Sequence, residues 1–134
     1  MNVEKAKTLT VATSEDVVRV RREVREHAVA IGFTLVDQTK IVTAASEIAR
    51  NTLEYGGGGT LRIEALKQGE RRGIRLTFSD EGPGIADLEQ ALRDGYTTGG
   101  GLGLGLGGAK RLSNEFDVRS TPGQGTTVIL ARWK

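Results

Sequence analysis

Two polar side chains in the segment "SEIARN" have a spacing that could support chemistry. Glu47 and Asn51 are four residues apart, so on a helix they stand on one face, one turn from each other. Each directly precedes a residue of the predicted buried stripe, Ile48 or Thr52, so the pair borders the core. A carboxylate can accept a proton, and a carboxamide oxygen can ligate Mg²⁺. Taken alone, the pair also fits an exposed glutamate beside a helix-weakening asparagine.

A second candidate is Asp80, at the end of "GIRLTFSDEGPG". Apolar residues alternate with polar ones before it, which predicts a strand whose even-numbered positions face the core. Asp80 continues that parity, so we expect its carboxylate to point inward, where it needs hydrogen-bond donors. The exocyclic amine of a purine is such a donor, and Gly82 and Gly84 would let a flat ring lie against the backbone. An aspartate that caps a turn is the alternative interpretation.

The densest glycine stretch lies in "TTGGGLGLGLGGAKR", residues 97–111, within a chain that has 19 glycines. Glycine lets backbone N–H groups approach a ligand, and a helix that begins after the tract would direct unpaired N–H groups at an anion such as phosphate. Gly103, Gly105 and Gly108 have G-x-G-x-x-G spacing, but no strand leads into them, and Lys110 does not complete a Walker A motif. A surface loop without a ligand is the alternative.

Hydrophobic periodicity predicts the elements that must position these residues. Thr13 and Asp16 have capping-box spacing at the start of a helix that Gly32 ends, and a second helix over residues 36–55 carries Glu47 and Asn51. Further expected elements are strands at 7–12, 60–66, 73–80, 116–120 and 126–133, a polar helix around 87–93 and a helix over 104–114. We expect one domain over residues 1–134, an α/β (α+β) two-layer sandwich with a mixed, mostly antiparallel sheet and helices on one face.

Composition excludes several classes of protein. The chain has 134 residues with 37% hydrophobic and 27% charged residues, as is usual for a soluble globular protein. A net charge of +2 without a block of like charge gives no reason to expect nucleic acid as a partner. No apolar run approaches about 18 residues, so we expect no membrane partner and a cytoplasmic location. The absence of cysteine rules out disulfides and thiolate metal sites.

Taken together, the motifs resemble those of the GHKL ATPase superfamily, whose nucleotide site is the Bergerat fold. Glu47-x-x-x-Asn51 resembles its N box, Asp80-x-Gly82-x-Gly84 its G1 box, and Gly99 to Gly107 its G2 lid, while Gly123-x-Gly125-Thr126 resembles its last glycine box. More narrowly, "EIARNTLEYGGGG", "DEGPGI" and "DGYTTGGGLGLGLGGAKRLSNEF" are similar to the RsbT-type switch serine/threonine kinases, relatives of the anti-sigma factors of bacterial stress signalling.

The resemblance implies ATP and Mg²⁺ as cofactors and a role for each motif. Asp80 would bind the adenine amine with help from Gly84 and Thr126, Asn51 would hold Mg²⁺ against the triphosphate, and Glu47 would act as the general base. The other nucleotide-binding candidates are Gly82, Ile85, Gly99, Gly100, Gly101, Leu102, Gly103, Leu104, Gly105, Leu106, Gly107, Lys110 and Arg111.

The resemblance also implies protein partners. The attacking hydroxyl would belong to a serine or threonine of a STAS-domain antagonist or scaffold protein, and its phosphorylation would pass a stress signal to a downstream regulator. Two alternatives stay open, namely an anti-sigma factor that senses nucleotide and sequesters a sigma factor, and the detached catalytic domain of a sensor histidine kinase. The missing phosphoacceptor helix argues against the second of these.

Three further residues bear on the resemblance. Glu54 stands where sensor kinases often carry a basic residue, so no phosphate contact is expected there. Gly108 stands where RsbT-like chains commonly have proline, which should loosen the start of the following helix. His27 is the only histidine, and we expect it to pack at the border of the first helix's apolar stripe instead of acting in catalysis.

Overall fold

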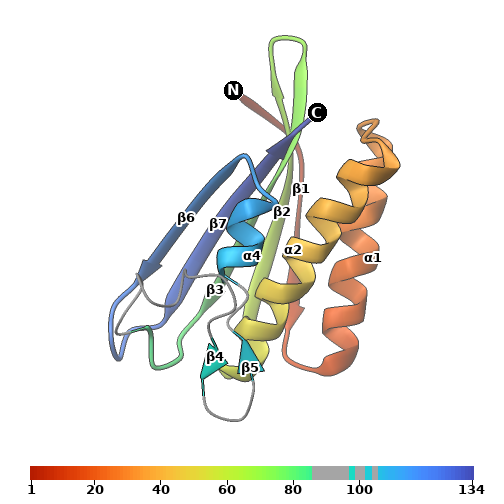
Figure 1. Cartoon of the computed structure of the whole chain (residues 1–134). Coiled ribbons are helices and arrows are strands. Elements are labelled where there is room, and N and C mark those ends of the chain that lie inside the picture. The colour runs from red at the N-terminus through yellow and green to blue at the C-terminus, as the bar shows by residue number, and fades with distance from the viewer. Residues whose placement is uncertain (86–96, 99–101, 104–105) are drawn as a thin grey trace.

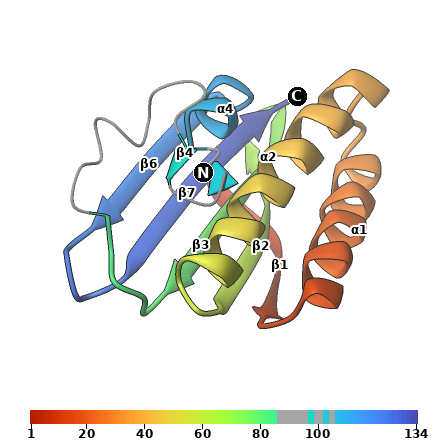
Figure 2. The same ribbon diagram turned by 60° about the horizontal axis from the view of Figure 1, so that its bottom comes forward.

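Five strands form one sheet, and all the described helices cover the same face of it. The computed structural model describes residues 1–85, 97–98, 102–103 and 106–134. The elements are β1 (Asn2–Val11), α1 (Ser14–Ala30), α2 (Leu35–Glu54), β2 (Gly59–Gln68), β3 (Arg71–Asp80), β4 (Thr97–Thr98), β5 (Leu102–Gly103), α4 (Leu106–Arg111), β6 (Glu115–Ser120) and β7 (Thr126–Trp133). Figures 1 and 2 show α1, α2 and α4 as one layer against the sheet. The predicted two-layer sandwich is confirmed.

The sheet has the strand order β1-β2-β3-β7-β6, and each neighbouring pair is antiparallel. We expected a mixed, mostly antiparallel sheet, and in the described part of the chain the five strands contain no parallel pair. The two residues of β4 pair with those of β5 in a separate ladder. In Figure 1 this ladder is drawn at the same end of the molecule as the C-terminal end of α2.

Local capping fixes where the two long helices begin. The Thr13 hydroxyl accepts a hydrogen bond from the Asp16 N–H (3.2 Å), and the Asp16 carboxylate accepts one from the Thr13 N–H (3.1 Å). This is the predicted capping box. Thr34 caps α2 in the same way, since its hydroxyl accepts from the Asp37 N–H. The chain reverses between the two helices at Gly32, where φ is +87°.

Two element boundaries differ from the sequence prediction by three residues or more, and another expected element is outside the described residues. β1 begins at Asn2 and not at residue 7, because it pairs with β2 from Asn2 onward, with a register shift between Val3 and Lys5, even where its side chains are exposed. α4 ends at Arg111 and not at residue 114, and Asn114 instead donates its N–H to the Ala131 carbonyl of β7. The expected polar helix around residues 87–93 is not described.

The register across the sheet places a polar row at one end of the core. The central rows of the covered face are apolar, for example Leu9, Leu61, Phe78 and Val128, all of which are buried. The last row toward the end of α2 pairs Gly59 with Asp80, Asp80 with Thr126, and Thr126 with Ser120. Because cross-strand partners point to the same face, these polar side chains lie together beside the core.

The acid dependence of stability follows from carboxylates that are paired in the folded protein. Hydrogen bonds from Arg132 hold the pKa of Asp37 below its ordinary value, and those from Arg75 do the same for Glu64. A lowered pKa stabilises the fold above the unfolded-state pKa, and this contribution is lost as the pH falls through the folded-state value. We therefore expect the free energy of unfolding, measured with urea, to decrease from about pH 5 to about pH 2. Glu64→Gln should make that decrease shallower; a stability that stays constant over this range would contradict the expectation.

Candidate functional site

A pocket lies at the polar end of the core, between α2 and the ends of β3 and β7. Its apolar lining includes Ile48, Phe78 and Val128, and its polar lining includes Asn51, Asp80 and Thr126. Gly84, Ile85 and Leu106 complete the set of predicted nucleotide-binding residues that line it. An apolar lining with a few convergent polar groups is usual for a site that binds a small organic ligand.

Asp80 is positioned by two backbone donors. Its Oδ1 accepts hydrogen bonds from the N–H of Gly82 (2.9 Å) and from the N–H of Thr126 (3.2 Å). The strand parity was therefore predicted correctly, and the turn-capping interpretation also holds, since the bond to Gly82 closes a turn. Within the part of the chain that the structure describes, Oδ2 accepts no hydrogen bond, so Asp80 keeps acceptor capacity for a ligand.

Ser120 is a functional candidate that the sequence analysis missed. Its hydroxyl accepts a hydrogen bond from the N–H of Ile85 (2.7 Å) and lies 2.8 Å from the Thr126 hydroxyl. It also donates to the Gly125 carbonyl (3.2 Å), which leaves the Thr126 hydroxyl as the donor between the two. Ser120 thus connects the segment after β3 with the start of β7. Its position opposite Thr126 across the "TPGQG" hairpin is the signal that could have identified it.

The close contact of the Asp80 turn with the end of α2 depends on two glycines. A Cβ on Gly82 would lie 2.6 Å from Gly56 Cα and 3.0 Å from the Tyr55 carbonyl oxygen, and a Cβ on Gly56 would overlap the Asp80 carboxyl group. Gly82 was predicted to admit a ligand ring, and the structure gives it a packing reason as well. Gly56 was not predicted, because its partner is distant in the sequence.

Asn51 and Glu47 lie differently with respect to the pocket. Asn51 lines it, and the Nδ2 of Asn51 is buried and has no hydrogen-bond partner within the described residues. Glu47, one turn earlier on α2, is not among the lining residues. The Glu47 side chain is 41% exposed and has the Arg50 guanidinium 3.9 Å away. The helix therefore places the two side chains on one face but brings only Asn51 into the pocket.

The expected G2 lid is only partly described. Gly99, Gly100, Gly101, Leu104 and Gly105 are outside the described residues. Leu102 and Gly103 form β5, and Leu106 and Gly107 begin α4 as buried residues. Lys110 and Arg111 are exposed at the other end of α4 and do not line the pocket.

His27 is packed, as predicted. It is 6% exposed, on α1, and its Nδ1 lies 2.8 Å from the Glu23 carbonyl oxygen. Since a carbonyl only accepts hydrogen bonds, this nitrogen carries the proton. His27 is not among the residues that line the pocket.

The donor set fits a nucleotide better than a metal ion bound by protein alone. Among the residues that the structure describes, no three His, Cys, Asp or Glu side chains are grouped so as to hold a metal. One carboxamide oxygen from Asn51 suits Mg²⁺, which commonly keeps water and phosphate oxygens as its other ligands. Asp80 Oδ2 and Asn51 Nδ2, which have no hydrogen-bond partner among the described residues, are polar groups that a purine nucleotide could satisfy. No helix in the described part of the chain is long and apolar enough to cross a membrane.

Comparisons with known proteins agree with this geometry. Residues 36–134 match the family described as histidine kinase-, DNA gyrase B-, and HSP90-like ATPase. The chain is 42% identical to a protein from Bacillus subtilis (strain 168) named serine/threonine-protein kinase RsbT, covering 92% of each chain. It is 31% identical to a protein named anti-sigma F factor from Thermoanaerobacter sp. (strain X514), covering 84% of this chain and 82% of the relative.

Solved structures show the same fold. The structure of the RsbU and RsbW domains of Rv1364c from Mycobacterium tuberculosis matches with a TM-score of 0.66 and 25% identity, covering 96% of this chain and 32% of that one. The catalytic domain of the histidine kinase ThkA matches with a TM-score of 0.53 and 17% identity, covering 96% of this chain and 95% of that one. The nucleotide-binding fold that the sequence motifs implied is confirmed.

Two single substitutions, compared with each other, test the glycine contact at the pocket. Gly82→Ala places a methyl group against the backbone of Gly56 and Tyr55, so we expect it to lower the free energy of unfolding by about 2 kcal/mol. Gly108→Ala is the matched control, because a Cβ there meets nothing within 4 Å and alanine favours a helix, which should stabilise by up to about 1 kcal/mol. Urea denaturation measures both. Equal effects of the two substitutions would show that the contact at Gly82 is not tight.

Proposed function

This chain belongs to the histidine kinase-, DNA gyrase B- and HSP90-like ATPases and, within them, to the RsbT-type serine/threonine-protein kinases, and from this premise we propose that it phosphorylates a STAS-domain partner at a serine or threonine. The observation that carries the proposal is the arrangement of Asp80, Thr126 and Asn51 around one pocket. The phosphoryl donor is ATP, with Mg²⁺ as its counter-ion.

Asp80 is the adenine-recognition residue in this proposal. Its Oδ1 is held by Gly82 and Thr126, so the carboxylate is fixed in place before a ligand arrives. The other carboxylate oxygen accepts from the adenine amine, while Ile48, Phe78 and Val128 offer apolar surface to the ring. Thr126, Gly84 and Ile85 complete the base-binding side, and Ser120 holds them together.

Asn51, Glu47 and the glycine tract act at the triphosphate. Mg²⁺ on the Asn51 carboxamide neutralises phosphate charge when it is bound. Residues 99–107 contact the phosphates through backbone N–H groups, with Lys110 and Arg111 as further cations. The acceptor hydroxyl oxygen bonds to the γ-phosphorus as the bond from that phosphorus to the β–γ bridging oxygen breaks. The hydroxyl proton passes to Glu47, and ADP is the leaving group.

Phosphorylation of the partner provides the switch. A phosphate carries nearly two negative charges, so like charges in a protein interface repel it and its desolvation there is costly. The modified partner therefore releases the kinase, which becomes available to a downstream regulator. The 31% identity to a protein named anti-sigma F factor favours a second candidate, a nucleotide-sensing protein that sequesters a sigma factor. Recovery of a sigma factor as the main bound protein, with no phosphate transfer to a STAS domain, would decide for that candidate.

Substitutions in the two parts of the site should have separable effects. Glu47→Gln removes the proton acceptor, so we expect kcat for transfer to a STAS-domain protein to fall by about 10²–10⁴-fold with ATP affinity nearly unchanged. Asp80→Asn replaces an acceptor by a donor at the adenine amine, so ATP affinity should fall by about tenfold or more. Transfer of ³²P from ATP and calorimetric titration with ATP measure the two effects.

Glu54→Gln serves as the control, because Glu54 is an exposed carboxylate at the end of the same helix. It should leave both transfer and binding as they are. Unchanged ATP binding by Asp80→Asn would refute the assigned adenine contact, and full transfer activity of Glu47→Gln would refute the assigned base.

A further inference from the structure

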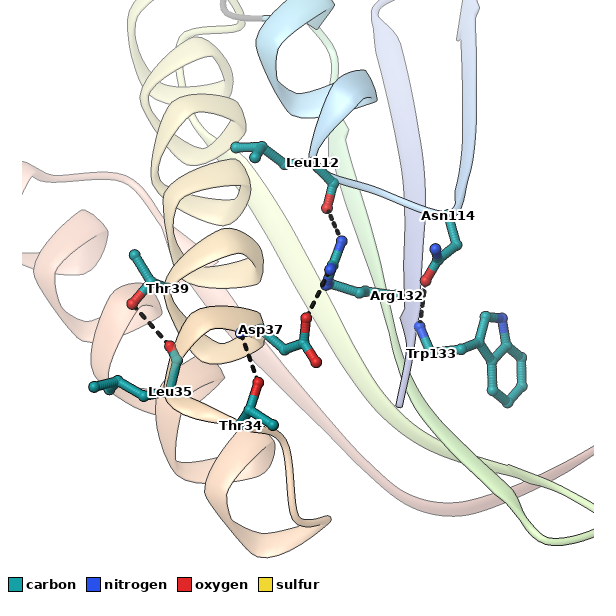
Figure 3. A network of polar contacts seen from close by, with 8 residues as sticks. All are labelled: Thr34, Leu35, Asp37, Thr39, Leu112, Asn114, Arg132 and Trp133. Atoms are coloured by element: carbon teal, nitrogen blue, oxygen red, sulfur yellow. Dashed lines mark hydrogen bonds and ion pairs between the residues drawn. The ribbon is translucent and has the colours of Figure 1, made fainter.

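One arginine joins three elements at the end of the molecule away from the pocket. Arg132, on β7, donates from Nη2 to Asp37 Oδ1 at the start of α2 (2.7 Å) and from Nη1 to the Leu112 carbonyl just after α4 (2.9 Å). Figure 3 shows the guanidinium between the two acceptors. The side chains of Arg132 and Asp37 are 13% and 25% exposed. We call Arg132, Asp37 and the Leu112 carbonyl the α4 clamp.

The position of α4 depends on contacts outside the helix. A helix of six residues has too few internal hydrogen bonds to be stable by itself. Leu106 and Ala109 bury its inner side in the core. Its far end is fixed by the clamp and by Asn114, whose N–H donates to the Ala131 carbonyl (2.9 Å) and whose Oδ1 accepts from the Trp133 N–H (2.6 Å). The far end is therefore the anchored end.

The near end of α4 forms part of the pocket. Leu106, its first residue, is 1% exposed and lines the pocket together with Ile48 and Asn51 of α2. Arg132 itself lies six residues after Thr126 on β7, a distance of about 20 Å along an extended strand. Arg132 is not among the residues that line the pocket. The guanidinium bonds to the start of α2 and to the segment after α4, so its contacts connect to the pocket through those two helices.

Stability alone is a weak reason for this ion pair. Burying a guanidinium and a carboxylate costs desolvation that the attraction between them largely offsets. The Arg132 Nε is buried without a hydrogen-bond partner in the described part of the chain, which adds to that cost. The guanidinium instead fixes the relative position of two elements, because two of its nitrogens donate to acceptors on different elements at a fixed spacing.

We infer that Arg132 is a positioning residue for nucleotide binding, which sets through the α4 clamp where Leu106 lies against α2. The inference rests on the proposed function, since it takes ATP as the ligand of the pocket. A loosened clamp leaves Asp80 and Asn51 in place but lets α4 shift. The nucleotide must then order α4 when it binds, and its affinity falls.

The test compares three clamp variants with a matched control. Arg132→Met and Asp37→Asn should each raise the Kd for ATP by about fivefold or more, and the KM for ATP with it, while kcat at saturating ATP stays within about twofold. Arg132→Lys should fall between Arg132→Met and the unaltered chain, since an ammonium group cannot hold both acceptors with the same geometry. Glu64→Gln is the control, because Glu64 is at least as buried and is paired with Arg75 (2.8 Å), but it alternates along β2 with Ile63 of the core and so points to the other face of the sheet.

Stability and position are separated by two further readouts. Urea denaturation identifies the clamp variants whose free energy of unfolding is at least that of Glu64→Gln. We expect those variants to bind ATP more weakly than Glu64→Gln does. Hydrogen exchange without nucleotide should show faster exchange at the amides of residues 109–113 in Arg132→Met than in Glu64→Gln. ATP affinities equal to that of Glu64→Gln, or equal exchange at these amides, would overturn the inference. Absence of ATP binding by the unaltered chain would overturn the proposed function instead, and the exchange experiment would still test the clamp.

Discussion

The pocket depends on one close backbone contact, where the turn after β3 lies directly against the chain that leaves α2. Gly82 and Gly56 make this contact possible, since a side chain on either would displace the other segment or the Asp80 carboxyl group. The contact brings the turn in which the Gly82 N–H donates to Asp80 Oδ1 against the end of α2, so that Asn51, on the last turns of that helix, faces the same pocket. A helix and a strand end that are distant in the sequence therefore form a single site, and glycine at these positions is a packing requirement before it is a ligand-binding one.

The sheet register supplies the other half of the site. Asp80 pairs with Thr126, and Thr126 with Ser120, so the Asp80 carboxylate and two hydroxyls come from three adjacent strands in one row. Because side chains alternate across a sheet, a slip of one residue would turn this row to the face that the described helices do not cover. The apolar rows next to it, such as Leu9, Leu61, Phe78 and Val128, prevent such a slip, since they would become exposed at the same time. The core thus holds the site in register.

Features that depend on neighbouring residues were predictable from the sequence, and features that depend on distant ones were not. The period of two in β3 predicted the orientation of Asp80, and the Thr13 capping box predicted the start of α1. Gly56 and Ser120 were missed because their roles come from partners that only the fold brings close. The end of α4 was placed too late because Asn114, which could continue a helix, is bound by β7 instead. Glu47 shares a face with Asn51, but four residues are slightly more than one turn, so Glu47 is rotated by about 40° from Asn51, away from Ile48 and Thr52, which line the pocket.

The position of Glu47 outside the pocket implies that, in the proposed reaction, the nucleotide binds before the partner docks. The Glu47 side chain, which is the base in the proposed reaction, is 41% exposed to water and lies 3.9 Å from the Arg50 guanidinium, and a hydrated carboxylate accepts a proton from a serine hydroxyl poorly. Nucleotide binding needs only the residues that already converge around Asp80, whereas proton transfer needs a partner whose surface covers Glu47 and excludes that water. In the proposed reaction, the acceptor protein would therefore complete the catalytic site as well as supply the hydroxyl. ATP bound without that partner would have no desolvated base beside it, which would limit its hydrolysis until the partner docks.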